Sequence, residues 1–223
     1  MITVVDGLNA HENEALLRDF YRLRARTFRD RLGWDVQVVD GEERDIFDTL
    51  DPAYLIALNP EGEVVGGLRI LQTTGPNMLA DVFSELLDGE PAPRSPQIWE
   101  STRFCIDTER LRDKRGPNSI THATSELMIA ACEYAMAAGV TDAVTVVDAM
   151  MHRVLKWSGN APSGYVGSPR QIGKVVALAV LLDCTQERID RIRAHSGITH
   201  DVFAPAPTTT PGAAAARGTL LVA

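Results

Sequence analysis

Six charged side chains in the first half of the sequence stand in segments that otherwise suit a protein interior. Three are arginines and three are carboxylates: Arg24, Arg69, Arg103, Asp45, Asp48 and Glu100. Removing a charge from water is costly unless it pairs with an opposite charge or binds a ligand. The set therefore favours either a buried ion-pair network or a binding site for a charged small molecule.

Each of these residues also has an ordinary structural explanation. Arg24 can reach water from the edge of a helix, and Asp45 and Asp48 can cap a turn or a helix. Glu100 and Arg103 can form a structural ion pair, although residues three apart in a strand point to opposite faces. Three nearby aromatic side chains can belong to the core: Phe28, Trp34 and Phe83. Taken one at a time, none of these residues decides the function.

The first half of the sequence predicts a long helix, a hairpin, a short helix and a further strand. Apolar residues at three- and four-residue spacing predict a helix over 12–31, in which Arg24 and Phe28 share a face. A segment rich in charges and turn residues follows over 34–52. Strands are expected at 54–58 and 63–73, then a short helix at 79–87 and a strand at 98–106. Alternation along that last strand places Glu100 and Phe104 on one face and Arg103 on the other.

The second half alternates helices with strands after a charged loop at 110–118. Helices are expected at 119–139, 149–157 and 185–195, and strands at 143–147 and 174–182. Hairpins followed by alternation are typical of a mixed sheet with helices on both faces. We therefore expect a single-domain α/β fold, a three-layer α-β-α sandwich, over residues 1–203. The low-complexity segment 204–223 is expected to be a flexible tail that the chemistry does not need.

The composition disfavours several classes of protein. The 223 residues are 45% hydrophobic and 23% charged, which is typical of a globular chain. A net charge of −8 makes nucleic acids and anionic membranes poor partners. The cysteines, Cys105, Cys132 and Cys184, lack zinc-site spacing, and no metal site is expected. With no signal-peptide pattern and no apolar run longer than 175–182, the sequence predicts a cytoplasmic protein without a membrane span.

The spacing of the charged and aromatic residues resembles that of a known family, the acyl-homoserine lactone synthases, which make quorum-sensing autoinducers. Most of the matching positions lie in the segments RLRARTFRDRLGW, ERDIFDTLDPAYLIAL, VVGGLRIL and WESTRF. The matching residues are Arg24, Phe28, Trp34, Asp45, Asp48, Arg69, Phe83, Glu100 and Arg103. The resemblance extends to about Phe203 and leaves the tail outside.

The resemblance implies a fold similar to that of the GNAT-type N-acyltransferases. It also implies a reaction in which an acyl group passes from the thioester of an acyl carrier protein, or of coenzyme A, to the amine of S-adenosylmethionine. The acylated product then lactonises and releases methylthioadenosine. S-Adenosylmethionine is thus a substrate, and the resemblance implies neither a cofactor nor a metal.

The resemblance suggests how side chains contact S-adenosylmethionine, which carries an amine, a carboxylate and a sulfonium. Asp45 and Asp48 suit the amine, and either Arg103 or Arg24 suits the carboxylate. The sulfonium and the adenine suit contacts with aromatic rings, for which the candidates are Phe28, Trp34, Phe83 and Phe104.

Glu100 is the candidate general base that removes a proton from the amine, directly or through a water. Backbone N–H groups near Arg103 and Phe104 are candidates for stabilising the oxyanion of the tetrahedral state. Arg69 and Arg24 can instead hold the carboxylates in place through ion pairs. The candidate catalytic residues are therefore Glu100, Asp45, Asp48 and Arg103.

The acyl chain is expected to lie against residues of the second half. The candidates are Thr145, Val147, Met150, Met151, Leu155 and Trp157, and core packing explains them equally well. In the family, a threonine on the strand corresponding to 143–147 often accompanies 3-oxo products. Spacing aligns Val147 rather than Thr145 with that position, which argues against a 3-oxo preference.

Acyl carrier proteins are acidic, so a basic docking surface is expected despite the negative net charge. Two groups of residues can supply it: Arg110, Arg112, Lys114 and Arg115, or His152, Arg153 and Lys156. A solvated run of charges is the ordinary explanation of either group.

Two alternatives to a lactone synthase remain at this point. One is a different GNAT-like N-acyltransferase that uses acyl-CoA and another amine. Such enzymes usually carry a glycine-rich pyrophosphate loop, and the stretch RGPNS before the helix at 119–139 does not match one. The other is a non-catalytic acyl-binding module, which has no need of Glu100 beside the pair Asp45 and Asp48.

Overall fold

The protein is described by a computed structural model over residues 1–115 and 119–203, without the side chains of 112–115 and 119–121. A seven-stranded sheet runs through it in the order β1-β4-β5-β6-β7-β9-β8. The strands are β1 (Ile2–Val5), β4 (Ala53–Leu58), β5 (Val64–Gln72), β6 (Ile98–Ile106), β7 (Asp142–Asp148), β8 (Gly164–Ile172) and β9 (Val175–Asp183). Neighbouring strands are antiparallel except β6 and β7, which are parallel. The expected tail at 204–223 lies outside the described residues.

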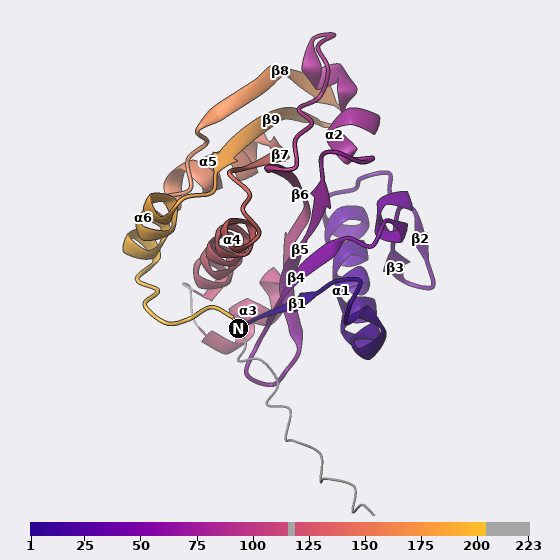
Figure 1. The fold of residues 1–223 in the computed structure, drawn as a ribbon. Helices are drawn as coiled ribbons and strands as arrows, with labels where there is room; N and C mark the ends of the chain where they lie inside the picture. Colours follow the sequence, from indigo (N-terminus) through magenta and orange to yellow (C-terminus); the bar gives the residue numbers. More distant parts are fainter. Residues whose placement is uncertain (116–118, 204–223) are drawn as a thin grey trace, which may run out of the picture.

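Helices cover both faces of the sheet (Figure 1). One face carries α1 (Glu14–Ala25) with its π-helical extension Arg26–Arg31, the small hairpin β2 (Val38–Val39) and β3 (Glu42–Glu43), η3 (Ile46–Thr49), α2 (Met78–Asp81) and η4 (Ser84–Leu87). The other face carries α3 (Thr108–Arg115), α4 (Ser119–Ala137), α5 (Ala149–Trp157) and α6 (Gln186–Ser196). A further short turn, η1, spans Ala10–Glu12. The expected three-layer α/β sandwich is confirmed.

Strand alternation separates the hydrophobic cores on the two sides of the sheet. On β4, Ile56 packs with α1 residues such as Phe20, whereas Leu55 packs with α4 residues such as Leu127. A third cluster, under α2 and η4, includes Leu79, Leu86 and Val144. The α1 face and the α4 face are therefore separate environments on one sheet.

Several elements differ from the sequence-based expectation. The sequence pattern does not predict the edge strand β8, because Gly167 and Pro169 interrupt it, yet proline is tolerated there because an edge strand leaves one side unpaired. A helix, α3, replaces the first part of the expected charged loop at 110–118, and Asp107 accepts from the Arg110 backbone N–H at its start. The short strand β1 and the hairpin β2–β3 are further additions to the expected elements.

A β-bulge on β6 changes which side chains share a face. Arg69 pairs with Thr102 and Gly67 with Cys105, so one residue of β5 lies opposite two residues of β6, Arg103 and Phe104. Arg103 has φ +55°, an uncommon backbone conformation for a residue other than glycine. The predicted alternation is therefore wrong beyond Thr102, because Phe104 packs on the α4 face.

The parallel strands β6 and β7 pair only at one end. Ile98, Trp99 and Glu100 pair with Asp142, Ala143 and Val144. Beyond Glu100 the two strands are not paired with one another, although both continue for several residues within the described chain. The sheet thus splits beside Glu100.

None of the helices in the described ranges combines the length and the apolar character that a bilayer crossing requires.

Candidate active site

Six charged side chains form an ion-pair network on the α1 face: Arg24, Arg69, Arg103, Glu43, Asp45 and Asp48. Arg24 lies at its buried end. The Nε of Arg24 donates to Glu43 at 2.6 Å, and its two terminal nitrogens donate to the two oxygens of Asp48 at 2.8 and 2.9 Å. The side chain is 0% exposed, and the rings of Phe20 and Tyr21 lie beside the guanidinium. Each nitrogen has a carboxylate partner and the side chain is fully buried, so Arg24 directs no donor towards solvent.

The short turn η3 brings Asp45 and Asp48 into the network. The Asp45 carboxylate accepts from the Phe47 N–H at 2.9 Å, and the Asp48 carboxylate accepts from the Asp45 N–H at 2.8 Å, which together form a capping box. Both carboxylates also accept from Arg69 on β5, at 2.5 and 3.0 Å for Asp45 and 2.8 Å for Asp48. Capping and ion pairing are thus both present.

Asp48 is nearly enclosed by donors. It accepts from Arg24, Arg69 and the Tyr54 hydroxyl, and its side chain is 5% exposed. Burial favours the protonated form, but the hydrogen bonds and charges of the two arginines prevail and hold the pKa of Asp48 well below its usual range. Asp48 therefore stays ionised at neutral pH.

Arg103 completes the network at its more open end. It contacts Asp45 at 2.8 Å and Glu43 at 3.1 Å, and its side chain is 9% exposed. Asp45 is 19% exposed, whereas Arg24 and Arg69 are 0% exposed. Within the network, Asp45 and Arg103 are therefore the pair nearest to solvent.

Glu100 lies apart from the carboxylates of the network. It is 0% exposed, and its two oxygens accept from the backbone N–H groups of Met78 and Leu79 at 2.7 and 2.6 Å, at the start of α2. Burial raises the pKa of Glu100 to about 7, although the two N–H donors oppose that rise. Glu100 and Arg103 do not form the ion pair that their spacing leaves open, because each has other partners.

The expected aromatic residues occupy two places on this face. Phe28 and Trp34 stack with ring centroids 5.2 Å apart, and the Arg103 guanidinium carbon lies 5.5 Å from the Phe28 centroid. Phe83 is half-buried and packs against the cluster that contains Met78. The Met78 sulfur lies 3.4 Å from an Arg103 nitrogen, so it links the two places.

The expected acyl-pocket residues divide into two groups. Val147 and Leu155 are buried in the α4-face cluster, and Met151 packs against that cluster, as Phe104 does. Thr145 is half-buried on the same strand as Val147. By contrast, two others are largely exposed, at 67% for Met150 and 72% for Trp157. Side chains this exposed do not line an apolar pocket in this structure.

The two expected basic surfaces are described to different extents. Arg110 is exposed on α3, whereas three further members of its group have side chains outside the described residues: Arg112, Lys114 and Arg115. On α5, Arg153 and Lys156 are exposed, and His152 contacts the Tyr165 hydroxyl at 3.0 Å.

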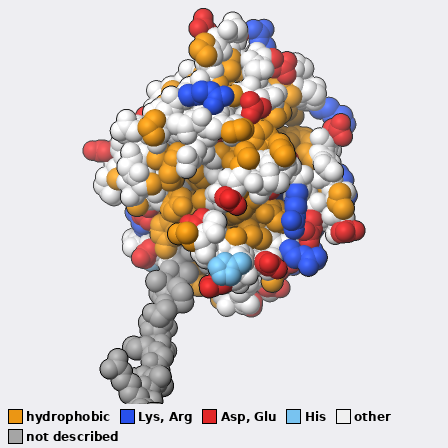
Figure 2. Space-filling view, turned by 45° about the vertical axis from the view of Figure 1, so that its right-hand side comes forward, with side chains coloured by type: hydrophobic (Ala, Val, Ile, Leu, Met, Phe, Trp, Pro, Cys, Tyr) orange, Lys and Arg blue, Asp and Glu red, His pale blue; other side chains and the backbone are white. Residues whose placement is uncertain are grey.

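In Figure 2, hydrophobic side chains gather across the middle of the face shown, with charged side chains mainly around them.

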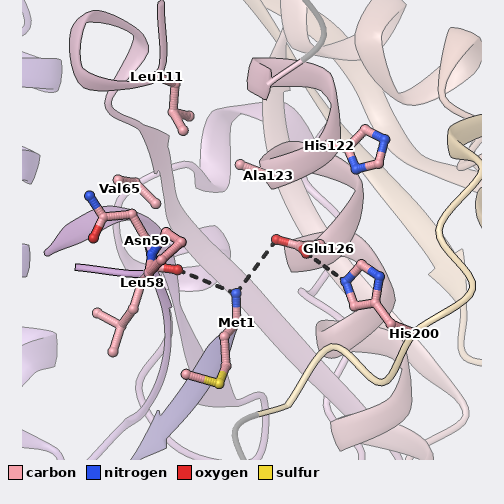
Figure 3. A pocket seen from close by; sticks show the side chains of 10 residues that line it. Met1, Leu58, Asn59, Val65, Leu111, His122, Ala123, Glu126 and His200 are labelled. Atoms are coloured by element: carbon pink, nitrogen blue, oxygen red, sulfur yellow. Dashed lines mark hydrogen bonds and ion pairs between the residues drawn. The ribbon is translucent and has the colours of Figure 1, made fainter. Parts of the chain in front are cut away.

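A cavity of about 680 Å³ lies at the N-terminus, away from the ion-pair network. Its walls include Leu58, Val65 and Ala123, and the N-terminal amine lies 3.7 Å from the Glu126 carboxylate (Figure 3). The residues matched to the synthase signature, all of them within the described ranges, do not line this cavity. It is therefore separate from the candidate active site.

The structure thus brings together most of the residues that the sequence singles out on this face. Phe104 is an exception, because the bulge turns it to the α4 face. The sequence reasoning misses Glu43, which is buried between Arg24 and Arg103. The sequence feature that indicates the hairpin carrying Glu43 is the dipeptide Asp40-Gly41. It favours a tight hairpin turn and here takes φ values of +52° and +80°.

The mixed sheet that splits between two parallel strands, beside a buried carboxylate, defines a GNAT-like fold. Comparison with known proteins makes the class more specific. The family model described as autoinducer synthase matches residues 8–192. The chain belongs to this autoinducer synthase family.

Individual relatives agree with that assignment. A probable acyl-homoserine-lactone synthase of Sinorhizobium fredii is 41% identical over 182 residues, which cover 82% of this chain and 86% of that protein. Among solved structures, the acyl-homoserine lactone synthase LasI is 30% identical with a TM-score of 0.75, over 90% of this chain and 98% of that one. BjaI, a CoA-dependent acyl-homoserine lactone synthase solved with S-adenosylmethionine and isopentyl-CoA, is 26% identical with a TM-score of 0.78, over 90% of both chains.

The expected activity is therefore confirmed at the level of the family: the chain is an acyltransferase of the acyl-homoserine-lactone synthase type, which produces quorum-sensing signals. This assignment takes the place of the two alternatives, another GNAT-like N-acyltransferase and a non-catalytic acyl-binding module.

Proposed function

We propose that the two substrates approach β6 from opposite faces of the sheet and react where the sheet splits. S-Adenosylmethionine binds on the α1 face, beside Asp45, Arg103 and the stacked rings. The acyl chain lies on the α4 face, against the cluster that includes Val147 and Leu155. The observation that carries this proposal is the end of β6–β7 pairing at Glu100, which leaves the backbone of β6 beyond that residue unpaired with β7.

The exposures within the network indicate which charges meet S-adenosylmethionine. Asp45, the most exposed carboxylate of the network, attracts the amine, and Arg103, the most exposed arginine, binds the carboxylate. Arg24 and Arg69 are fully buried and hold Asp45 and Asp48 in place. Asp48 acts through this support rather than by contact, because its side chain is only 5% exposed.

The aromatic residues cover the apolar and cationic parts of the same substrate. Trp34, half-buried and stacked on Phe28, offers a ring face to the sulfonium or the adenine. Phe83 lies at the start of η4 and packs against the cluster that contains Met78. Phe104 belongs to the acyl side, because it faces α4.

Glu100 acts as the general base. Its pKa of about 7 lets it exist in both protonation states near neutral pH, which suits proton transfer from an ammonium group. A water carries the proton, because both carboxylate oxygens face the N–H groups of α2 rather than the Asp45 end of the network. The N–H groups of β6 near Arg103 and Phe104 stabilise the oxyanion.

The reaction proceeds in two steps. The neutral amine nitrogen attacks the thioester carbonyl carbon, a C–N bond forms, and the C–S bond breaks to release the donor thiol with a proton. The carboxylate of the acylated product then attacks the carbon next to the sulfonium, whose C–S bond breaks to release neutral methylthioadenosine. The second step is intramolecular and needs orientation more than acid–base help.

The donor is the thioester of either an acyl carrier protein or coenzyme A. Arg153 and Lys156 on α5 support the first, because they are exposed on the same helix as Leu155 and can attract an acidic carrier. The similarity to a CoA-dependent synthase supports the second.

We place the reaction in the cytoplasm, in agreement with the free thiols of the three cysteines.

The test is product analysis with purified protein. We expect methylthioadenosine and an acyl-homoserine lactone in equal amounts, seen by chromatography and mass spectrometry, when S-adenosylmethionine is supplied with a series of acyl thioesters. Parallel series on acyl carrier protein and on coenzyme A identify the donor. Thiol release without methylthioadenosine from every donor would contradict the proposal.

A further inference from the structure

Glu43 is a fully buried carboxylate on β3, a strand of only two residues. Alternation sends the side chains of Glu42 and Glu43 to opposite sides of this strand. Glu42 meets three exposed arginines at the surface of α1 and the hairpin: Arg18, Arg22 and Arg44. Glu43 instead points inward and has 1% of its side chain exposed.

The contacts of Glu43 join a fixed arginine to a less constrained one. Glu43 Oε2 accepts from Arg24 Nε at 2.6 Å, and Arg24 is itself locked by two hydrogen bonds to Asp48. On its other side, Glu43 accepts from Arg103 Nε at 3.2 Å and from Arg103 Nη2 at 3.1 Å. Glu43 is therefore the link between the buried end of the network and the arginine nearest to solvent.

Arg103 is the residue of the network that most needs such a link. Its backbone is in the left-handed region at φ +55°, at the bulge of β6, and its long side chain lies beside the ring of Phe28 and the sulfur of Met78. An arginine that binds a substrate carboxylate must hold its guanidinium plane in one orientation. Glu43 supplies that constraint through two of the three nitrogens.

The charge of Glu43 also matters for a cationic substrate. The ion-pair network holds three guanidinium groups and three carboxylates, Glu43 among them, so these six charges balance. S-Adenosylmethionine carries an amine, a sulfonium and a carboxylate, and is a net cation when the amine is protonated. Removing the charge of Glu43 leaves the network net positive where this cation binds.

We propose that Glu43 is a positioning residue that holds the Arg103 guanidinium against the Arg24–Asp48 pair, in the orientation that receives the carboxylate of S-adenosylmethionine. This inference rests on the proposed binding of S-adenosylmethionine on the α1 face. Glu43 itself does not touch the substrate and acts mainly through Arg103, with a smaller effect of its charge.

The test compares Glu43→Gln with Glu42→Gln, two neutralised neighbours on one strand. Titration calorimetry measures the Kd of S-adenosylmethionine, steady-state kinetics measures kcat and both KM values, and thermal melting reports folding. For Glu43→Gln we expect the Kd and KM of S-adenosylmethionine to rise about tenfold with the KM of the acyl donor unchanged. For Glu42→Gln we expect both substrates to bind as in the wild type.

A double-mutant cycle shows whether Glu43 acts through Arg103. In an Arg103→Gln background, we expect Glu43→Gln to weaken the binding of S-adenosylmethionine by no more than about twofold further, because the group it orients is absent and only the effect of its charge remains. Full additivity would overturn the proposal, as would a Kd for folded Glu43→Gln within about twofold of the wild type.

If Glu43→Gln does not fold, Glu43→Asp takes its place in the same measurements. Aspartate keeps the charge but is too short to reach both arginines, so we again expect the Kd of S-adenosylmethionine to rise. An unchanged Kd for Glu43→Asp would show that the link to Arg103 is not needed.

The same titrations separate this inference from the proposed function. Failure of the wild-type protein to bind S-adenosylmethionine would overturn both. Wild-type binding that Glu43→Gln leaves intact would overturn only the role of Glu43.

Discussion

Replacing Glu100 by glutamine distinguishes a general base from a purely structural carboxylate. Glutamine has nearly the same shape but cannot accept from both Met78 and Leu79, because one of its two polar ends is a donor. We expect kcat to fall by about 100-fold or more, which is the usual contribution of a general base, while the Kd of S-adenosylmethionine changes much less.

The raised pKa of Glu100 gives this prediction a pH dependence. With a pKa of about 7, wild-type Glu100 is half ionised near neutrality and about one-tenth ionised one pH unit lower. We expect wild-type kcat/KM to rise about tenfold per pH unit below that pKa and to level off above it. We expect the residual activity of Glu100→Gln not to show this rise with pH.

The free energy of unfolding provides a second readout, and it changes with pH in the direction opposite to the activity. Burial raises the pKa of Glu100 from 4.5 to about 7, so the folded state binds this proton more tightly than the unfolded state does. The wild type therefore loses roughly 3 kcal/mol of unfolding free energy as the pH rises through this range, a loss that Glu100→Gln does not show. At low pH the variant is less stable by about 1–3 kcal/mol, because one backbone N–H loses its acceptor.

The assay is methylthioadenosine release between about pH 5.5 and about pH 8.5, which spans more than one pH unit on either side of the Glu100 pKa. Urea unfolding is measured from about pH 4 to about pH 8.5, because the change in stability begins at the unfolded-state pKa of Glu100. A Glu100→Gln enzyme that keeps more than about a third of wild-type kcat at every pH would refute the base role. A loss of stability alone would then identify Glu100 as the acceptor that fixes the start of α2.

Three further predictions concern other parts of the molecule. Trp34→Ala should raise the Kd of S-adenosylmethionine about tenfold, or roughly 1.4 kcal/mol, by calorimetry, and an unchanged Kd would exclude the contact. Arg69→Met should cost about 3–5 kcal/mol in urea unfolding, because it leaves Asp45 and Asp48 with one arginine fewer in a buried place; a cost below about 1 kcal/mol would contradict the importance of the network. Removing 204–223 should leave product formation unchanged in the methylthioadenosine assay, and a loss of activity would show that the tail is needed.

Periodicity predicts the long elements because their hydrophobic patterns are strong. The helix expected at 12–31 places Arg24 and Phe28 on one face, as the structure shows, although its last part is π-helical. The hairpin of β4 and β5 is predicted by its turn residues. The helix α3 is not predicted, because its sequence consists mostly of charged residues and therefore shows no hydrophobic periodicity.

The side-chain arrangement of the site is harder to predict than its composition. Nothing in the local sequence marks Arg103 as the bulged residue, since glycine is the usual signal for φ above zero and arginine is not. Alternation therefore places Arg103 and Phe104 on the wrong faces. Glu43 escapes prediction for a different reason, because it is one of several charges in the segment 34–52 and only the Asp-Gly turn indicates the hairpin that buries it.

The bulge at Arg103 has a consequence for how this enzyme can diversify. With the two substrates placed as proposed, two consecutive residues of one strand contact different substrates from opposite faces of the sheet. Arg103 lies on the side of S-adenosylmethionine, and Phe104 lies on the side of the acyl chain. Mutations on α4 or α5 can then change the acyl side and leave the ion-pair network untouched, because the sheet lies between them. The acyl group of the signal can therefore change during evolution while the residues that serve lactone formation stay constant.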